Sequence, residues 1–227
     1  MKRPAIKSPF ILINLKAYQE SIGKAAHTIA RAAEMVSEES GITIGVCPMY
    51  MDIHPIEHHY AIPVFAQHID PIVPGAYTGM ISAHAVRAAG ACGSLINHSE
   101  HRQTIADIGS CVKTLRELDM WSCVCTNDSA STSAAAAYYP DFVAIEPPEL
   151  IGSGISVSKA NPEIIKESVD KAKAISPDTR VLTGAGISTG ECVKTALDLG
   201  SHGVLLASGV VKSKDPESAL RELISLI

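Results

Sequence analysis

Four polar side chains follow apolar runs of the sequence and could together carry acid–base chemistry. Asn14 and Lys16 come after residues 10–13, His98 comes shortly after residues 94–96, and Glu146 directly follows residues 142–145. A carboxylate can act as a general base, an imidazole can transfer protons, and an ammonium and an amide can stabilise negative charge. If these runs are neighbouring parallel strands, their carboxyl ends meet at one site.

The segment after Glu146 combines stiffness with freedom of movement. Residues 147–148 are both proline, which fixes φ and restricts the preceding residue, so the beginning of the segment is rigid. Residues 150–151 are apolar and could cover a ligand, and the Gly-Ser-Gly at 152–154 could absorb the dihedral changes of closure. These features predict a lid that excludes water from the carboxylate. The alternative is a rigid connection into a helix capped near Ser158.

Two glycine-containing turns follow the last two apolar runs: GAGIS at residues 184–188 and ASG at residues 207–209. In barrels of eight parallel strands, the loops after the seventh and eighth strands frequently bind phosphate. Glycine lets backbone N–H groups approach an anion closely, and a following helix N-terminus adds a favourable dipole. We therefore expect a phosphate site at these turns, and the alternative is ordinary turn glycines.

The elements that must position these groups alternate along the chain. Apolar runs lie at residues 10–13, 42–46, 64–66, 94–96, 121–125, 142–145, 180–182 and 203–206. Most lack the alternation of a half-exposed strand, as expected for strands buried on both faces. Helices are predicted at residues 22–39, 82–91, 100–118 and 130–139, and after the capping residues Asp128, Asn161, Thr189 and Asp215. Only the segment after Cys47 is ambiguous, because three prolines should keep any helix there short.

Eight strand–helix units without an intervening linker predict one α/β domain over residues 1–227, folded as a (β/α)8 barrel. The rival architecture is an open doubly wound sheet. That fold expects a glycine-rich turn after the first strand, where this sequence has Asn14-Leu15-Lys16. In a barrel, functional residues lie at the carboxyl ends of the strands, so the four side chains above should share one mouth with Cys47, Gln67 and residues 126–127.

Composition argues against several classes of function. The 227 residues carry a formal net charge of −5 and contain 19% charged residues, without the basic patch that nucleic-acid binding needs. The longest apolar runs have about five residues, far too few to span a bilayer. The N-terminus lacks the apolar segment of a secretion signal. We expect a cytoplasmic protein that binds neither nucleic acid nor membranes.

Cysteine and histidine spacing does not predict a metal site. None of the six cysteines forms a C-x-x-C pair, and we interpret all six as small buried residues in a reducing compartment. Cys123 and Cys125 should share one face of a strand. His54 and His58 are spaced i, i+4, with His59 adjacent, but no third strong ligand stands beside them.

Five motifs, in order along the chain, resemble those of the triosephosphate isomerase family, in particular its short archaeal type. They are Asn14-Leu15-Lys16, LINHSEHR at residues 95–102, AIEPPELIGSG at 144–154, GAGIS at 184–188 and LLASGVV at 205–211. PGAYTG at residues 74–79 also resembles the protruding loop that this family inserts into a neighbouring subunit. Each motif alone is weak, but together they are specific and extend over most of the chain.

The resemblance implies an isomerase that interconverts dihydroxyacetone phosphate and D-glyceraldehyde 3-phosphate in glycolysis and gluconeogenesis, without metal or organic cofactor. Glu146 would remove a proton from the carbon beside the carbonyl. His98 would polarise the carbonyl as a neutral imidazole and move protons between the enediolate oxygens. Lys16 would hold the phosphate and stabilise developing charge, and Asn14 would help to orient Lys16. Glu100 would be an outer acid near Lys16, and it also suits the first turn of a helix.

The same resemblance implies which residues surround the substrate and cover its phosphate, largely through backbone N–H groups. They are Asn14, Leu15, Lys16, Ile151, Gly152, Gly186, Ala207 and Ser208. Closure of this cover matters because an enediolate phosphate exposed to water can lose its phosphate.

Four residues, at three places in the chain, depart from most of the family. Pro148-Glu149 stands in place of a valine–tryptophan pair, as in the archaeal branch, and Thr183 replaces a tyrosine before the glycines at 184–186. Both should change how a closed lid is held. Met80 replaces a glutamate after the protruding loop, which affects contacts between subunits. The short archaeal members imply a homotetramer, and a dimer is the alternative.

Two other functions fit parts of the sequence. Other phosphate-binding barrels, such as lyases or synthases of aromatic amino-acid or thiamine metabolism, share the two glycine turns but not the Asn-x-Lys, Asn-His-Ser-Glu and Glu-Pro-Pro motifs together. A non-catalytic sensor of phosphorylated metabolites would be expected to have lost the base or the imidazole, whereas Glu146, His98 and Lys16 are all present.

Overall fold

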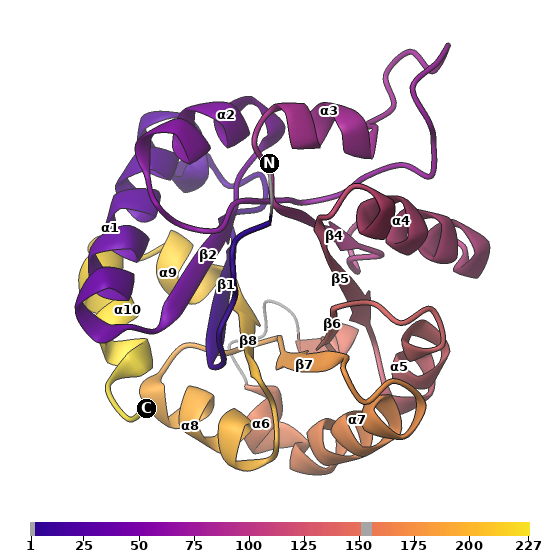
Figure 1. Ribbon diagram of the computed structural model, residues 1–227. Helices are drawn as coiled ribbons and strands as arrows, with labels where there is room; N and C mark the ends of the chain where they lie inside the picture. Colours follow the sequence, from indigo (N-terminus) through magenta and orange to yellow (C-terminus); the bar gives the residue numbers. More distant parts are fainter. Residues whose placement is uncertain (1–2, 151–155) are drawn as a thin grey trace.

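The computed structural model describes residues 3–150 and 156–227, and over this part of the chain helices surround a ring of parallel strands (Figure 1). The sheet has eight strands in the order β2-β1-β8-β7-β6-β5-β4-β3. Their bounds are β1 Phe10–Asn14, β2 Thr43–Cys47, β3 Phe65–Ala66, β4 Gly93–Ile96, β5 Trp121–Thr126, β6 Phe142–Ile145, β7 Arg180–Thr183 and β8 Gly203–Leu206.

A parallel bridge from Val46 to Val64 links β2 to the residue before β3, so the ring is nearly closed. The first strand therefore pairs with β2 on one side and with the last strand, β8, on the other. In an open doubly wound sheet the last strand would lie at an edge and would not pair with the first. The predicted (β/α)8 barrel is confirmed, and the doubly wound sheet is excluded.

The helices lie outside the ring, and a helix is present wherever one was predicted from the sequence. The helix predicted from residue 100 begins only at Ile105, because Thr104 caps it, so Glu100 does not lie in its first turn. Their bounds are α1 Lys24–Ser40, α2 Tyr50–His59, α3 Ala83–Ala88, α4 Ile105–Glu117, α5 Ser129–Ala136, α6 Val157–Ala160, α7 Pro162–Ile175, α8 Gly190–Asp198, α9 Ser208–Val211 and α10 Pro216–Ile224, with the 3-10 turns η1 Gln19–Ser21 and η2 Pro148–Leu150. Asp128, Asn161, Thr189 and Asp215 each accept a hydrogen bond from the first turn of the helix they cap. These four predicted caps are confirmed.

The segment after Cys47 differs from the expectation. It forms the ten-residue helix α2, which continues through Pro55. A proline inside a helix removes one hydrogen bond and strains the preceding turn. Here Ile53 and Ile56 are fully buried against the barrel, and this packing outweighs the local cost. Proline spacing alone was therefore a poor guide to helix length in this segment.

Both faces of the strands are buried, as the apolar runs predicted. In β1, Phe10 and Leu12 belong to the cluster inside the barrel, whereas Ile11 and Ile13 pack between the barrel and the helices. The interior is tightly filled: the ring of Phe10 lies 6.0 Å from Phe65 and 5.5 Å from Phe142. This packing requires a glycine where β1 meets β8, because a Cβ at Gly203 would lie 1.9 Å from the carbonyl oxygen of Phe10.

Two further features flank the barrel. The segment before β1 covers its N-terminal end, where Arg3 stacks on Trp121 at 3.7 Å and Trp121 donates a hydrogen bond to the carbonyl of Pro4. Between β3 and α3 the chain projects away from the barrel (Figure 1). This projecting segment, residues 70–82, exposes the apolar side chains of Val73, Tyr77 and Met80. Within the described residues, the structure has no helix of the length and apolarity needed to cross a membrane.

Candidate functional site

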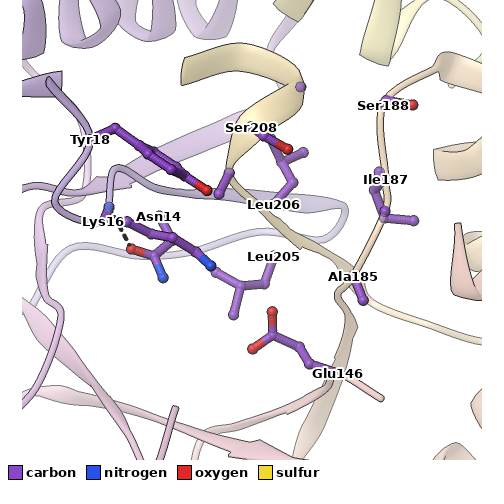
Figure 2. Close-up of a pocket in the computed structure, with 13 residues that line it drawn as sticks. Asn14, Lys16, Tyr18, Glu146, Ala185, Ile187, Ser188, Leu205, Leu206 and Ser208 are labelled. Atoms are coloured by element: carbon purple, nitrogen blue, oxygen red, sulfur yellow. Dashed lines mark hydrogen bonds between the residues drawn. The ribbon is translucent and has the colours of Figure 1, made fainter. Parts of the chain in front are cut away.

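A cavity of about 160 Å³ lies at the end of the barrel where the strands finish (Figure 2). The loops after β1, β6, β7 and β8 border it. Its lining residues are Asn14, Lys16, Tyr18, Glu146, Ala185, Gly186, Ile187, Ser188, Leu205, Leu206, Ala207, Ser208 and Gly209. The structure thus brings the loops after β1 and β6 together with the two glycine-containing turns, as the sequence predicted.

Glu146 follows β6 and is held by the neighbouring strand. Its backbone N–H donates to the carbonyl of Thr126 at 2.8 Å, and its side chain is 9% exposed. Burial raises the pKa of the Glu146 carboxyl above its ordinary value, while His98, Cys125 and Lys16 oppose this rise. A carboxylate with a raised pKa is a stronger base than an exposed one, which suits proton abstraction near neutral pH.

His98 is positioned by the residue before it. Asn97 has a φ of 61°, a left-handed conformation that asparagine tolerates better than most residues. Its side chain donates to the carbonyl of Cys125 at 3.0 Å and accepts from the backbone N–H of Gln103 at 2.9 Å. The loop after β4 is therefore tied to β5, and the His98 ring has a fixed place.

The two ring nitrogens of His98 have different surroundings. Nδ1 accepts a hydrogen bond from the backbone N–H of Glu100 at 3.2 Å, so the ring proton of the neutral imidazole belongs on Nε2. Nε2 lies 3.5 Å from Oε2 of Glu146. Among the described residues neither of these two buried atoms has a hydrogen-bond partner. An unpaired donor and an unpaired acceptor thus face each other, and of these two residues Glu146 lines the cavity whereas His98 lies behind it in contact distance.

Lys16 is held in an unusual backbone conformation with φ of 51°. Its N–H donates to Oδ1 of Asn14 at 3.0 Å (Figure 2), and its carbonyl accepts from the side-chain amide of Gln67 at 2.9 Å. A left-handed non-glycine residue costs about 1–2 kcal/mol, and these two contacts offset part of that cost. The Lys16 ammonium lies 2.7 Å from Oε1 of Glu100, as expected for an outer acid near Lys16.

The turns after β7 and β8 present backbone to the cavity. Ala185 and Gly186 both have φ of 69°, and α9 begins at Ser208, beside the cavity. The two turns are in close contact, because a Cβ at Gly209 would lie 3.1 Å from the carbonyl oxygen of Ile187. Small residues therefore leave room for backbone N–H groups to reach an anion here.

Gly184 has a role that the sequence did not reveal. A Cβ at this position would lie 2.3 Å from Cγ of Glu146, far inside contact distance. The glycine thus makes the space that the Glu146 side chain occupies. From the sequence, Gly184 was only the first residue of a possible phosphate turn.

Other residues predicted to belong to the site do not line the cavity, or they lie outside the residues that the structure describes. Leu15 is fully buried in the core. Thr126 bonds to Thr132 at 2.9 Å, and Asn127 accepts from Arg102. Ile151 and Gly152, and most of the predicted lid with them, lie outside the described residues. The helix after this segment, α6, is capped by Ser156, two residues before the position considered.

Cysteines and histidines form no recognisable metal centre in the part of the chain that the structure describes, since no group of three or more His, Cys, Asp or Glu could hold an ion there. All six cysteines are free; Cys92 is partly exposed, and the other five are buried. Cys123 and Cys125 share one face of β5, as predicted, and that face belongs to the cluster inside the barrel. Burial raises the pKa of the Cys92 thiol to about 12 and that of Cys111 to about 11.

Sequence reasoning did not single out Tyr18, which lines the cavity beside Lys16. A signal was available, because Tyr18 follows Lys16 by two residues in the loop after the first apolar run. Isoleucine and leucine side chains after β7 and in β8 also line the cavity. They resembled ordinary core residues in the sequence.

Comparison with known proteins agrees with this arrangement. The profile of the triosephosphate isomerase family matches residues 9–226. A triosephosphate isomerase of Methanoculleus marisnigri is 63% identical over 220 residues, which cover 97% of this chain and 99% of that protein. The corresponding protein of Methanocaldococcus jannaschii is 55% identical over 217 residues, 96% of this chain and 99% of its own length. The chain belongs to the triosephosphate isomerase family.

Proposed function

We propose that this protein interconverts dihydroxyacetone phosphate and D-glyceraldehyde 3-phosphate through an enediolate. The proposal is carried by one observation: His98 Nε2 and Glu146 Oε2 face each other, buried and unpaired among the described residues, beside a cavity that Lys16 also borders. The names of its relatives support the same reaction. The reaction belongs to glycolysis and gluconeogenesis, and we propose a cytoplasmic location for it.

Glu146 acts as the base. Its carboxylate takes the proton from the carbon beside the substrate carbonyl and returns it to the neighbouring carbon. Its burial supports this role because a poorly solvated carboxylate holds a proton more strongly. The Gly184 backbone keeps the carboxylate next to the cavity, since no side chain competes for that space.

His98 and Lys16 stabilise the charge that proton removal creates. The Nε2–H of His98 donates a hydrogen bond to the substrate carbonyl oxygen while that oxygen becomes an enediolate oxygen. The His98 imidazole then transfers protons between the two enediolate oxygens. Lys16 places a positive charge at the cavity, which Asn14 also lines. Asn14 fixes the strained backbone of Lys16 through its Oδ1, and Glu100 fixes the ammonium.

The phosphate of the substrate binds at the turns after β7 and β8. Backbone N–H groups of Gly186, Ala207 and Ser208 surround it there, with the Lys16 ammonium alongside. The proposal extends to Leu15, which supports the loop after β1, and to Ile151 and Gly152 as the closing cover. It requires no metal and no organic cofactor.

We further propose that the protein assembles as a homotetramer, with a dimer as the alternative. The projecting segment, residues 70–82, exposes apolar side chains of Val73, Tyr77 and Met80 that a neighbouring subunit could cover. Sedimentation velocity at several concentrations distinguishes the two assemblies. Substitution of Tyr77 by serine should shift the distribution toward smaller species, and an unchanged distribution would remove the projecting segment from the interface.

The reaction is tested with a coupled assay that follows conversion of glyceraldehyde 3-phosphate to dihydroxyacetone phosphate. Wild type, Glu146→Gln and the exposed control Glu38→Gln are compared, so that each variant removes one carboxylate. Turnover should fall by about 10²–10⁴-fold or more in Glu146→Gln, and it should be unchanged in the control. A wild type that binds phosphoglycolate but converts no triose phosphate would show that the phosphate site is correct and the reaction is not.

A further inference from the structure

Tyr18 occupies a place in the cavity that the proposed mechanism does not use. It follows β1 and lines the cavity with Lys16 and Ser208. In Figure 2 its hydroxyl is directed into the cavity, on the side where Ser208 begins α9. The phenol therefore reaches the wall of the cavity where the phosphate is proposed to bind.

The backbone and the ring of Tyr18 are both held. Its carbonyl accepts hydrogen bonds from the N–H of Ser21 at 3.0 Å and from the hydroxyl of Ser21 at 2.9 Å. The Nζ of Lys212 lies 4.5 Å from the centre of its ring, within the range of a cation–π contact. Because Lys212 follows α9 and Ser208 begins it, this contact joins the loop after β1 to the turn after β8.

The hydroxyl of Tyr18 can still donate a hydrogen bond. In the described part of the chain it makes no hydrogen bond, although the ring is partly buried and packs against the hydrophobic core. A phenol O–H is a good donor to an anionic oxygen, and such charge-assisted bonds are stronger than neutral ones. A fixed ring with a free donor aimed into a cavity is suited to binding a ligand oxygen.

The charges near the cavity make a further donor valuable. The Lys16 ammonium already forms an ion pair with Glu100 at 2.7 Å, so its positive charge is partly compensated. Lys212 forms no ion pair with a carboxylate among the described residues. Its ammonium lies 4.5 Å from the centre of the Tyr18 ring and adds positive potential near the cavity that Tyr18 lines.

We propose that Tyr18 is a further substrate-binding residue whose hydroxyl donates to a phosphate oxygen, and that Lys212 is a positioning residue that holds the Tyr18 ring and adds positive potential. The inference rests on the proposed function, since it concerns the phosphate of the same substrate. The proposed phosphate site then includes the side chains of Tyr18 and Lys212 in addition to the backbone N–H groups and Lys16. The family resemblance did not imply a role for either side chain.

The test removes only the hydroxyl, with Tyr18→Phe, which leaves the ring and its contact with Lys212 in place. The matched control is Tyr139→Phe, at a tyrosine that is 62% exposed. Phosphoglycolate affinity, measured by calorimetry, should weaken about 10- to 100-fold in Tyr18→Phe and stay unchanged in the control. Turnover of glyceraldehyde 3-phosphate should fall by a similar factor in kcat/KM, and this loss should be much larger than any loss in the slow turnover of glyceraldehyde, which lacks phosphate.

A second pair of variants tests Lys212 without altering the tyrosine. Lys212→Met should weaken phosphoglycolate binding in low salt by about 3- to 10-fold, and the loss should shrink as salt is added. Lys214→Met removes an exposed lysine of the same segment and should have no effect. Thermal melts of every variant verify that each is folded.

The outcomes separate this inference from the proposed reaction. Unchanged phosphoglycolate affinity in a folded Tyr18→Phe overturns the inference, and so does an equal loss of turnover for glyceraldehyde and glyceraldehyde 3-phosphate. If wild type binds phosphoglycolate but isomerises nothing, the proposed reaction fails, and the calorimetric comparison still decides the role of Tyr18. A wild type that does not bind phosphoglycolate overturns both.

Discussion

Nε2 of His98 lies 3.5 Å from Oε2 of Glu146, and among the described residues neither atom has a hydrogen-bond partner. Buried polar atoms are nearly always paired in folded proteins, and an unpaired one costs about 1–3 kcal/mol. These two unpaired atoms therefore lower the folding stability of the protein. A ligand oxygen and a ligand C–H placed between the two groups would use both atoms.

Replacing Glu146 by glutamine should stabilise the protein at neutral pH. Burial raises the pKa of the Glu146 carboxyl in the folded state. The contribution of Glu146 to the free energy of unfolding is therefore most favourable at low pH, and it declines as the pH rises above the pKa of about 4.3 that a glutamate has in the unfolded chain. Thermal melts at pH 4 and pH 7.5 test this. Glu146→Gln should melt higher than wild type at pH 7.5, with a smaller gain at pH 4, while Glu38→Gln should match wild type at both. A lower melting temperature at pH 7.5 would contradict the expectation.

The same raised pKa predicts the acid side of the activity profile. Only the ionised Glu146 can take a proton, so kcat/KM should fall as pH drops through the pKa of this carboxyl in the free enzyme. Since burial raises that pKa, the midpoint should lie above the ordinary glutamate value of about 4.3. Assays between pH 4 and pH 8 at constant ionic strength measure it. A midpoint at or below the ordinary value would mean that burial does not control the base.

Gly184→Ala should displace the Glu146 side chain. The new Cβ would lie 2.3 Å from Cγ of Glu146, so one of the two must move. A misplacement of about 1 Å can lower the rate about 10²-fold, and we expect a loss of that size in kcat. The stability cost should be coupled to Glu146: in a Glu146→Ala background, which has no Cγ, Gly184→Ala should be much less destabilising. Equal costs in both backgrounds would show that the clash is relieved elsewhere.

Asp70, at the start of the projecting segment, should make the stability of the protein depend on pH in the acid range. Partial burial raises the pKa of Asp70, but its hydrogen bonds from the Ile81 N–H at 2.6 Å and from His68 outweigh burial, and the net pKa is lowered. A lowered carboxyl pKa adds stability above the unfolded value of about 3.9, which is lost as pH falls through the folded pKa. Asp70→Asn should therefore melt lower than wild type at pH 7 and lose less stability between pH 5 and pH 3. Asp178→Asn, at an exposed aspartate, serves as the control; an identical pH profile for Asp70→Asn and wild type would contradict the prediction.

Much of this protein could be predicted from local patterns in the chain. Eight apolar runs, each followed by a helical stretch, led to the barrel, because strands buried on both faces need covering helices. Asn161, Thr189 and Asp215 marked helix beginnings because a side-chain cap acts within one turn. Asn14, Lys16 and Glu146 were found because parallel strands bring their carboxyl ends to one cavity. Such features depend on neighbours in sequence or on one rule of topology.

What only the tertiary structure decided are contacts between distant parts of the chain. Gly184 touches Glu146 across β6 and β7, and the ring of Tyr18 meets Lys212, which comes almost two hundred residues later in the sequence. The left-handed backbone of Lys16 is supported by Gln67 after another strand. No local pattern encodes such pairs, because they exist only once the barrel closes and sets the distances between its loops. Residue types and their order determined which groups this protein has for chemistry, and the packing of its strands decided which of them face one another.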